Sequence, residues 1–188
     1  MNENIVVRPF APSDAQAVTD LFVAVNRQLA PQHLTEAFEV YIEDSIAAEI
    51  GRIAEYYRDK KGQFRVVTAG SELVGMFGLE PYGSDAMELR RMYVDPAWRR
   101  RGIAGKMLRV AEDDCRRLGL ARLELSTSEI QGDALSFYRR SGYRPDREEI
   151  VNTASNKTIG GGIRRFYFSK MLQSEEAQGA GSEPPGTR

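Results

Sequence analysis

Short runs of β-branched and aromatic residues, set apart by turn residues, predict the strands of this chain. The first run, Asn4–Phe10, is ended by Pro9. Three later runs are separated by a hairpin signal at residues 70–72 and by a turn at Gly83, which predicts an antiparallel meander. The expected strands span residues 4–10, 64–70, 73–81, 86–96, 121–128 and 163–172.

Apolar residues at steps of three and four positions predict helices between these strands. Ser13 followed by Gln16 has the form of a capping box at the start of the first helix. The second is a single long amphipathic helix whose other face is largely acidic. The third begins after Gly102 and ends at Gly119, where a C-terminal cap belongs. The expected helices span residues 13–30, 35–60, 102–119 and 132–142.

The length of 188 residues suits one compact α/β domain. We expect that domain to span residues 1–172. The polar stretch 173–188 has almost nothing to bury and is expected to be a disordered C-terminal tail. No signal-peptide pattern opens the chain and no apolar run approaches the length of a membrane span, so we expect a cytoplasmic protein with no membrane partner.

Composition restricts the chemistry that the chain can carry. Charged residues make up 28% of the chain, yet the formal net charge is -1, which argues against a chain built to bind nucleic acid. Cys115 and His33 are the single cysteine and histidine, so no disulfide framework or Cys/His metal site can be assembled, and no metal is expected. Catalysis must therefore use other side chains.

Three consecutive arginines, Arg99–Arg101, lie where an expected strand meets an expected helix. The first backbone N–H groups of a helix have no intrahelical partners and carry partial positive charge, so this junction favours a phosphate group. Gly102 and Ala104 have little or no side chain and would allow a pyrophosphate within hydrogen-bond reach of the backbone. The alternatives are a solvated turn and a basic localisation signal. The G-x-G-x-x-G and G-x-x-x-x-G-K-[ST] nucleotide patterns are both absent from the sequence.

Arg99, Gly102 and Ala104 match the signature R/Q-x-x-G-x-G/A of the GNAT superfamily of acyl-CoA-dependent N-acetyltransferases, which the chain resembles over roughly residues 5–172. A second family pattern, N-x-x-A followed by Y and G-[FY], is met in QGDALSFYRRSGY, except that Gln131 stands at the usual Asn position. The order of the expected elements also fits. The resemblance implies an α/β (α+β) fold in a single GNAT-type domain, with a central mixed, mostly antiparallel sheet flanked by helices.

The same resemblance implies acetyl-CoA as co-substrate. The pantetheine arm would pair like an additional strand with Met92, Tyr93 and Val94, and the amide of Met92 or its neighbour would face the thioester carbonyl. Gln131 keeps an amide side chain that could contact the cofactor. The pyrophosphate would be held by the turn residues Arg99, Arg100, Arg101, Gly102, Ile103, Ala104, Gly105 and Lys106.

Two side chains are catalytic candidates by resemblance. Tyr138 would lie beside the CoA sulfur and protonate the leaving thiolate; the alternative is a core tyrosine beside Phe137. Glu88 lies on the strand before the basic turn, at the offset where some family members keep a glutamate, and would accept the amine proton through a water. The alternatives for Glu88 are an ion pair with a neighbour such as Arg90, or a base role taken by Glu80 or bulk water.

We therefore expect direct transfer of an acetyl group, within a ternary complex, from acetyl-CoA to the primary amine of a small molecule. Acetylation of a protein N-terminus or lysine and a non-catalytic acyl-CoA sensor are alternatives, a nucleic-acid partner is disfavoured, and a homodimer is left open. The acidic face of the second helix is either solvated or attracts a cationic acceptor. Its residues are Glu36, Glu39, Glu43, Asp44, Glu49 and Glu55.

Overall fold

The computed structural model of the protein describes residues 4–172, so the tail expected at 173–188 lies outside the described residues. The strands are β1 (Ile5–Pro9), β2 (Gln63–Ala69), β3 (Glu72–Tyr82), β4 (Ala86–Val94), β5 (Arg122–Ser128), β6 (Arg144–Val151) and β7 (Ile163–Met171). The α-helices are α1 (Ala15–Leu29), α2 (Thr35–Ala48), α3 (Ile53–Asp59), α4 (Ile103–Arg117) and α5 (Gly132–Arg140).

The strands form one sheet in the order β1-β2-β3-β4-β5-β7-β6. Neighbouring strands are antiparallel, except that β4 and β5 run parallel. Gly70 and Gly83 both have positive φ in the turns that connect β2, β3 and β4, a conformation that glycine adopts at little cost. The predicted meander and the predicted mixed, mostly antiparallel sheet are confirmed.

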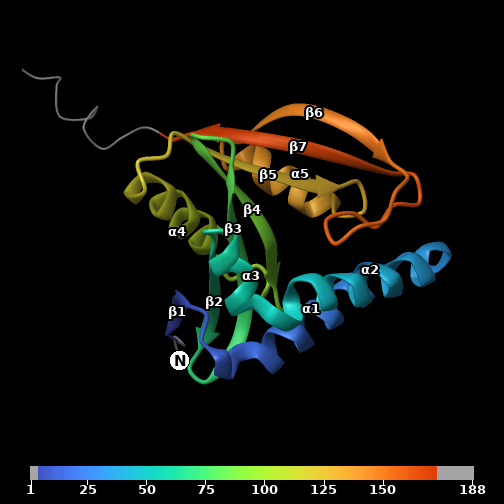
Figure 1. Cartoon of the computed structure of the whole chain (residues 1–188), viewed down its shortest axis with the longest axis horizontal. Coiled ribbons are helices and arrows are strands. Elements are labelled where there is room, and N and C mark those ends of the chain that lie inside the picture. The colour runs from blue at the N-terminus through green and yellow to red at the C-terminus, as the bar shows by residue number, and fades with distance from the viewer. Residues whose placement is uncertain (1–3, 173–188) are drawn as a thin grey trace, which may run out of the picture.

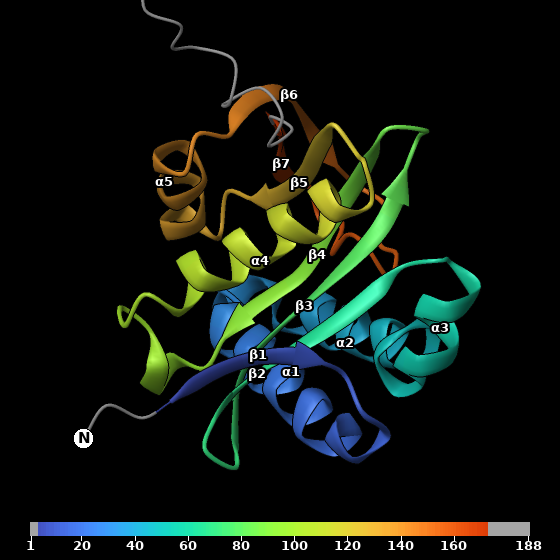
Figure 2. The same ribbon diagram turned by 90° about the vertical axis from the view of Figure 1, so that its left-hand side faces the viewer.

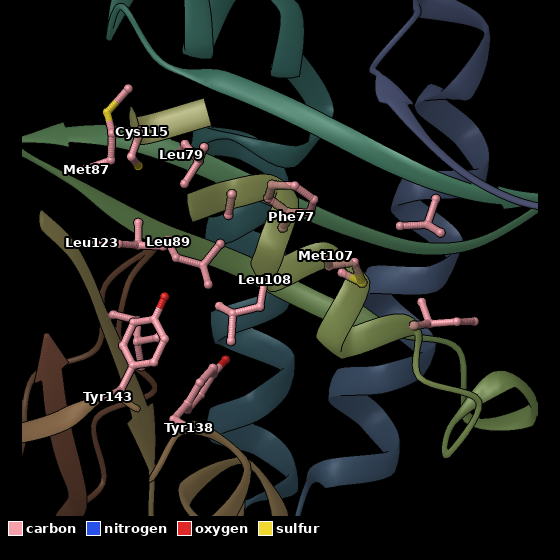
Figure 3. Close-up of a cluster of buried hydrophobic side chains, with 14 of the residues drawn as sticks. Phe77, Leu79, Met87, Leu89, Met107, Leu108, Cys115, Leu123, Tyr138 and Tyr143 are labelled. Atoms are coloured by element: carbon pink, nitrogen blue, oxygen red, sulfur yellow. The ribbon is translucent and has the colours of Figure 1, made fainter. Parts of the chain in front are cut away.

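Helices cover both faces of the sheet. Figure 2 shows α4 and α5 on one side of the strands and α1, α2 and α3 on the other. One apolar core fills the space under α4 and α5 and includes Phe77 and Met107 (Figure 3). The other lies under α1–α3 and includes Phe22. All three side chains are fully buried, and burial of a side chain of this kind stabilises a fold by about 1.5–3 kcal/mol.

The single long helix predicted over residues 35–60 is wrong. The chain instead forms α2, a 3-10 turn at Ile50–Arg52 and α3. Glu49 leaves the helical conformation, with φ of -142° and ψ of -62°. A Cβ on Gly51 would lie 2.8 Å from the carbonyl oxygen of Ile46, so the close approach of the backbone here requires glycine. Apolar residues before and after the turn pack into the same core, which explains why their spacing conceals the break.

Strand β6 has no counterpart among the predicted strands. Its side chains are exposed at nearly every position, so it lacks the alternation of apolar and polar residues that marks a half-buried strand. It also contains Pro145, which suits an edge strand. Strand β6 pairs only with β7 among the described elements, so it lies at the edge of the sheet.

The start of α1 also differs from the predicted capping box at Ser13. A 3-10 turn precedes α1, and the carboxylate of Asp14 accepts the backbone N–H of Ala11 at 2.8 Å. The same carboxylate pairs with Arg8 on β1 at 2.7 Å. Asp14 therefore joins the first strand to the first helix, and Ser13 does not act as the cap.

Two features that mark broad function classes are absent from residues 4–172. No helix in this range combines the length and the apolar character needed to cross a bilayer. The same range holds no group of three or more His, Cys, Asp or Glu side chains placed to bind a metal ion.

Candidate active site

Strands β4 and β5 separate part way along their length. They pair from Ala86 with Arg122 as far as Leu89 with Leu125. Beyond that point β5 continues beside β7, with Ser128 opposite Arg165, while β4 continues beside β3. The sheet is therefore open on one edge of β4 from Arg90 onward, within the described residues.

A β-bulge bends β4 where it leaves β5. The register shifts between the pairs Met76–Tyr93 and Gly78–Arg90, so two residues of β4 lie opposite one residue of β3. Arg91 in this bulge has φ of 54°, which is uncommon for a residue with a side chain. Strained backbone of this kind persists only where the surrounding structure holds it in place.

The separation of the two strands opens a cavity of about 110 Å³. Residues of β4, β5 and α5 line one part of it, and residues of α1, α2 and the connection between β6 and β7 line the other. Figure 1 shows that connection reaching towards α2. The cavity brings together these residues predicted from the sequence: Glu88, Met92, Tyr93, Gln131 and Tyr138.

The basic turn lies at the end of β4, between that strand and α4, as the sequence predicts. Gly102 immediately precedes α4 with φ of 77°, and a Cβ at this position would have no heavy atom within 4 Å. The amide of Lys106 donates to the carbonyl of Gly102 at 3.1 Å, which leaves the preceding first-turn amides without intrahelical acceptors. An open, left-handed glycine beside unpaired amides fits a pyrophosphate group.

The cationic side chains of the turn differ in what they contact. The guanidinium of Arg101 lies 4.5 Å from the centre of the Trp98 ring, a cation–π contact. Arg99 donates from Nε to the carbonyl of Val94 at 3.4 Å, and Lys106 donates from Nζ to the carbonyl of Ile5. The side chains of Arg101 and Lys106 are thus held against the protein, which leaves the free backbone amides before Lys106 as the main groups of the turn that can contact a phosphate.

Tyr138 points from α5 towards the strand that carries the bulge. Its hydroxyl oxygen lies 3.7 Å from the sulfur of Met92, and its side chain is buried. The ring packs against Tyr143, with 6.0 Å between ring centres (Figure 3). Burial raises the pKa of the Tyr138 hydroxyl above its usual value of 10.0, so this group is protonated at neutral pH.

Glu88 pairs with a lysine that the sequence did not suggest. Its carboxylate accepts from Nζ of Lys157 at 2.9 Å, on the connection between β6 and β7. The side chain of Glu88 is 17% exposed and that of Lys157 is 44% exposed. The alternative pairing with Arg90 is wrong, because Arg90 binds Glu80 and Glu49 instead. The reserve candidate Glu80 is therefore held by a guanidinium, and it also accepts from the Tyr56 hydroxyl at 2.7 Å.

The main group that sequence reasoning missed is a buried ionic network beside the bulge. Glu49 is fully buried and accepts from Arg90 at 2.9 Å, from Arg91 at 2.7 Å and from the hydroxyl of Tyr57 at 2.7 Å. Burial alone would raise the pKa of this carboxyl, but the two guanidinium groups outweigh it and hold the pKa below the usual 4.5. Two adjacent arginines on a strand with buried neighbours are the sequence signal that could have indicated such a partner.

The expectation for the acidic face of the second helix is wrong at Glu49, which is neither solvated nor available to an acceptor. Glu39 pairs with Arg27 on the molecular surface. From α2 the cavity receives the side chains of Phe38 and Tyr41 and no acidic group among the described residues. The structure therefore gives no support to attraction of a cationic acceptor by this helix.

Known proteins resemble this chain in sequence and in fold. N-acetyltransferase family 8 member 2 of Rattus norvegicus is 27% identical over 139 residues, which cover 71% of this chain and 60% of that protein. Aminoalkylphosphonate N-acetyltransferase of Salmonella typhimurium is 31% identical over 91 residues, which cover 46% of this chain and 59% of that protein. The chain thus spans about 60% of the length of these curated relatives.

The fold matches solved structures. The PaiA N-acetyltransferase of Thermoplasma acidophilum, in complex with coenzyme A, superposes with a TM-score of 0.70 at 19% identity, covering 89% of this chain and 99% of that one. An acetyltransferase of the GNAT family from Staphylococcus aureus Mu50 gives a TM-score of 0.69 at 17% identity. Residues 25–143, well over half of the chain, match the family model described as the acetyltransferase (GNAT) family. The chain therefore belongs to the acetyltransferase (GNAT) family.

Proposed function

We propose that this protein is an N-acetyltransferase that transfers the acetyl group of acetyl-CoA to the primary amine of a small molecule, by direct attack within a ternary complex. The observation that carries the proposal is the opening between β4 and β5. It places Tyr138 and Glu88 around one cavity, and β4 leads from that cavity to the turn at Gly102. Family membership and the names of the curated relatives support the same activity.

The residues of the turn and of β4 would hold the co-substrate. Acetyl-CoA supplies the acetyl group as a thioester. The free amides from Gly102 to Gly105 would bind its pyrophosphate, with Arg99 and Arg100 adding positive charge. The backbone of Met92, Tyr93 and Val94, on the edge of β4 that no longer pairs with β5, would bind its amide-bearing arm. Gln131, whose side-chain oxygen accepts from Thr127 at 2.9 Å, keeps its amide N–H group available to the same ligand.

Glu88 would accept the proton of the acceptor amine. Its ion pair with Lys157 is partly exposed, and pairs of that kind contribute about 0–1 kcal/mol, so an acceptor ammonium can replace Lys157 at little cost. As the amine nitrogen bonds to the acetyl carbon and the carbon–sulfur bond breaks, the amine proton passes to Glu88 through a water. Glu80 is a weaker candidate, because Arg90 and Tyr56 already occupy its oxygens.

Tyr138 would return a proton to the departing thiolate. A buried phenol stays protonated at neutral pH, and the phenolate that remains after Tyr138 donates its proton is reprotonated by solvent once the thiol leaves. The same hydroxyl contacts Met92, whose amide, or that of its neighbour in the bulge, is the candidate donor to the thioester oxygen.

Acetylation of a protein N-terminus or lysine stays an alternative acceptor class, because the matched relatives do not share one named substrate. The non-catalytic sensor is disfavoured by the presence of both candidate catalytic groups at one cavity. The cytoplasmic location, the homodimer and the absence of nucleic-acid and membrane partners stay predictions from the sequence.

A thiol-release assay with acetyl-CoA over a mixed library of amines tests the proposal. Free CoA should appear faster with at least one amine than with buffer alone, and mass spectrometry should find that amine heavier by one acetyl group. If acetyl-CoA binds but no amine or peptide accelerates thiol release, the protein is a sensor and the proposed function is wrong.

A further inference from the structure

Arg165 on β7 presents a guanidinium group to the cavity without a carboxylate partner. Its Nε and Nη2 atoms both donate to the hydroxyl oxygen of Ser126 on β5, at 3.1 Å and 2.8 Å. No carboxylate oxygen of residues 4–172 lies within 4.0 Å of its nitrogen atoms. The acidic residue opposite it on β6, Glu149, accepts from Arg147 and from the Tyr167 hydroxyl instead.

The other charged groups around the cavity balance one another. Arg90 and Arg91 are matched by Glu49 and Glu80, and Lys157 is matched by Glu88. Within the described part of the chain, Arg165 thus hydrogen-bonds only to a neutral hydroxyl, and the carboxylate of Glu149 acts on its charge from beyond ion-pair distance. A partly buried guanidinium is stabilised by an anionic oxygen group, and its planar fork fits a carboxylate or a phosphonate with two parallel hydrogen bonds.

Arg165 lies on the same face of the sheet as Glu88. Glu88 is opposite Glu124 on β5, and residues two and four positions further along β5, Ser126 and Ser128, face the same way. Arg165 is the β7 partner of Ser128. The cavity therefore holds a carboxylate that can receive an ammonium group and, on the same face, a cation that can receive an oxyanion.

We propose that the acceptor is an amine that also carries an oxyanion, a carboxylate or a phosphonate, and that Arg165 is the residue that selects it. The acceptor ammonium replaces Lys157 at Glu88, and the oxyanion binds the guanidinium of Arg165, which Ser126 holds in position. Phe38 and Ile159 line the same cavity and supply an apolar wall for the remainder of the molecule. This inference rests on the proposed function, because it names the acceptor class of the same site.

Matched pairs of acceptors test it. Amino acids with small, aliphatic and aromatic side chains are compared with their amides, and aminoalkylphosphonates with the corresponding amino alcohols. The anionic member of at least one pair should be the better acceptor by kcat/KM. In Arg165→Gln, which keeps a donor for Ser126 but removes the charge, kcat/KM for that anionic acceptor should fall about 10- to 100-fold, the range for a lost charge-assisted hydrogen bond. In the same variant, kcat/KM for the neutral member of that pair should be unchanged.

Arg164→Gln is the matched control. Arg164 is the adjacent residue of β7, is exposed and pairs with Glu148 at 2.7 Å. This variant should leave both members of every pair unchanged. An equal loss for anionic and neutral acceptors in Arg165→Gln would overturn the inference, since it would assign Arg165 a structural role. A preference for carboxylates over phosphonates, or the reverse, identifies which oxyanion the site takes.

Binding of products separates this inference from the proposed function. In the presence of CoA, calorimetry should show tighter binding of an N-acetyl amino acid than of its amide, and Arg165→Gln should abolish the difference. Turnover of amines without any preference for anionic ones overturns the inference alone. Selective binding without turnover of any amine supports the anion site and contradicts the acetyltransferase activity. If neither turnover nor selective binding is observed, both the inference and the proposed function are overturned.

Discussion

The hydroxyl oxygen of Tyr138 on α5 lies 3.7 Å from the sulfur of Met92 on β4. This contact spans the opening where β4 has left β5, and Met92 lies in the bulge next to Arg91. Helix α5 thus places the protonated hydroxyl group of Tyr138 beside the part of β4 where the backbone bends. Packing of α5 on the sheet brings the proposed proton donor and the bent backbone together, since the Tyr138 ring lies in the same core as Phe168.

Replacement of Tyr138 by phenylalanine should lower kcat and leave KM for acetyl-CoA nearly unchanged. The substitution removes a single oxygen, and the proposed contacts to the co-substrate lie mainly on backbone amides elsewhere. A positioned acid contributes about 10²–10⁴ in rate, so a fall in that range is expected in steady-state assays with the best amine. Tyr143→Phe is the control, because Tyr143 packs against the same ring but donates to Glu112, away from the cavity. A kcat for Tyr138→Phe within about threefold of wild type would make Tyr138 a packing residue.

Replacement of Gly102 by alanine should weaken binding of acetyl-CoA. Gly102 has φ of 77°, so a side chain there strains the backbone, and its Cβ would project into the open space before α4. Gly119→Ala is a matched control at the other end of α4, since Gly119 has φ of 71° and equally open surroundings. Both variants should lose a similar free energy of unfolding, about 1–2 kcal/mol. Equal affinities of the two variants in calorimetry would argue against a pyrophosphate at Gly102.

Glu88→Gln tests the proposed base. The amide keeps the shape of the side chain but cannot accept the amine proton, so the acidic limb of kcat/KM against pH should move or vanish. Glu124→Gln is the comparison, because Glu124 lies directly opposite on β5 and pairs with Arg122 at 2.9 Å. If the profile of Glu88→Gln matches that of wild type, the proton goes to water or to Glu80.

Glu49→Gln should destabilise the fold strongly. Removal of one partner from a buried ionic group costs about 3–5 kcal/mol, because Arg91 loses its carboxylate partner and Arg90 keeps only Glu80. Glu55→Gln, at an exposed pair with Arg52, should change stability little and serves as the control. Urea unfolding at neutral pH measures both. A Glu49→Gln protein as stable as wild type would show that the network does not support the bulge.

The pH dependence of this network follows from the direction of its pKa shift. The pKa of Glu49 is lower in the folded protein than the usual 4.5, so the folded state favours the ionised form. The stabilisation is therefore complete above about pH 4.5 and is lost as the pH falls through the lower folded pKa. The difference in unfolding free energy between wild type and Glu49→Gln should shrink over that acidic range.

The sequence predicts the central strands, α4 and α5 because each carries its own local pattern. The basic turn is also local, since the glycine, the arginines and the start of α4 are consecutive residues. The break at Glu49 is different. At the break, Glu49 contacts Arg91, 42 residues away, and no local spacing reports that contact. Strand β6 was missed because an exposed edge strand buries too little to produce an alternating pattern.

In the candidate site, too, some groups are marked by a local sequence pattern and others are brought together only by contacts between distant segments. Most positions predicted for the co-substrate, from Met92 to Lys106, lie on β4, the basic turn and the start of α4, which follow each other in the chain. The other two, Gln131 and Tyr138, lie beyond β5, at α5. The groups around the acceptor come from distant segments, as when Lys157 reaches Glu88 across 69 residues. Arg165 attracted no attention in the sequence because it is one of two adjacent arginines on a strand. Only the pairing of β7 with β5 distinguishes it from Arg164.

The departure of β4 from β5 gives the described sheet a further edge, away from its two outer edges at β1 and β6. Within residues 4–172, the backbone of β4 between Arg90 and Val94 is paired by β3 on one side and by no strand on the other. Proteins commonly guard such edges at the periphery, where charged side chains discourage further strands. Here residues of α1, α2 and α5 line the cavity beside the edge, and Met92–Val94 are only partly buried, so a slender chain bearing amides can reach it. Amide hydrogen exchange along this part of β4 should therefore slow sharply when coenzyme A binds, because the cofactor would then supply the hydrogen-bond partners that a neighbouring strand supplies elsewhere in the sheet.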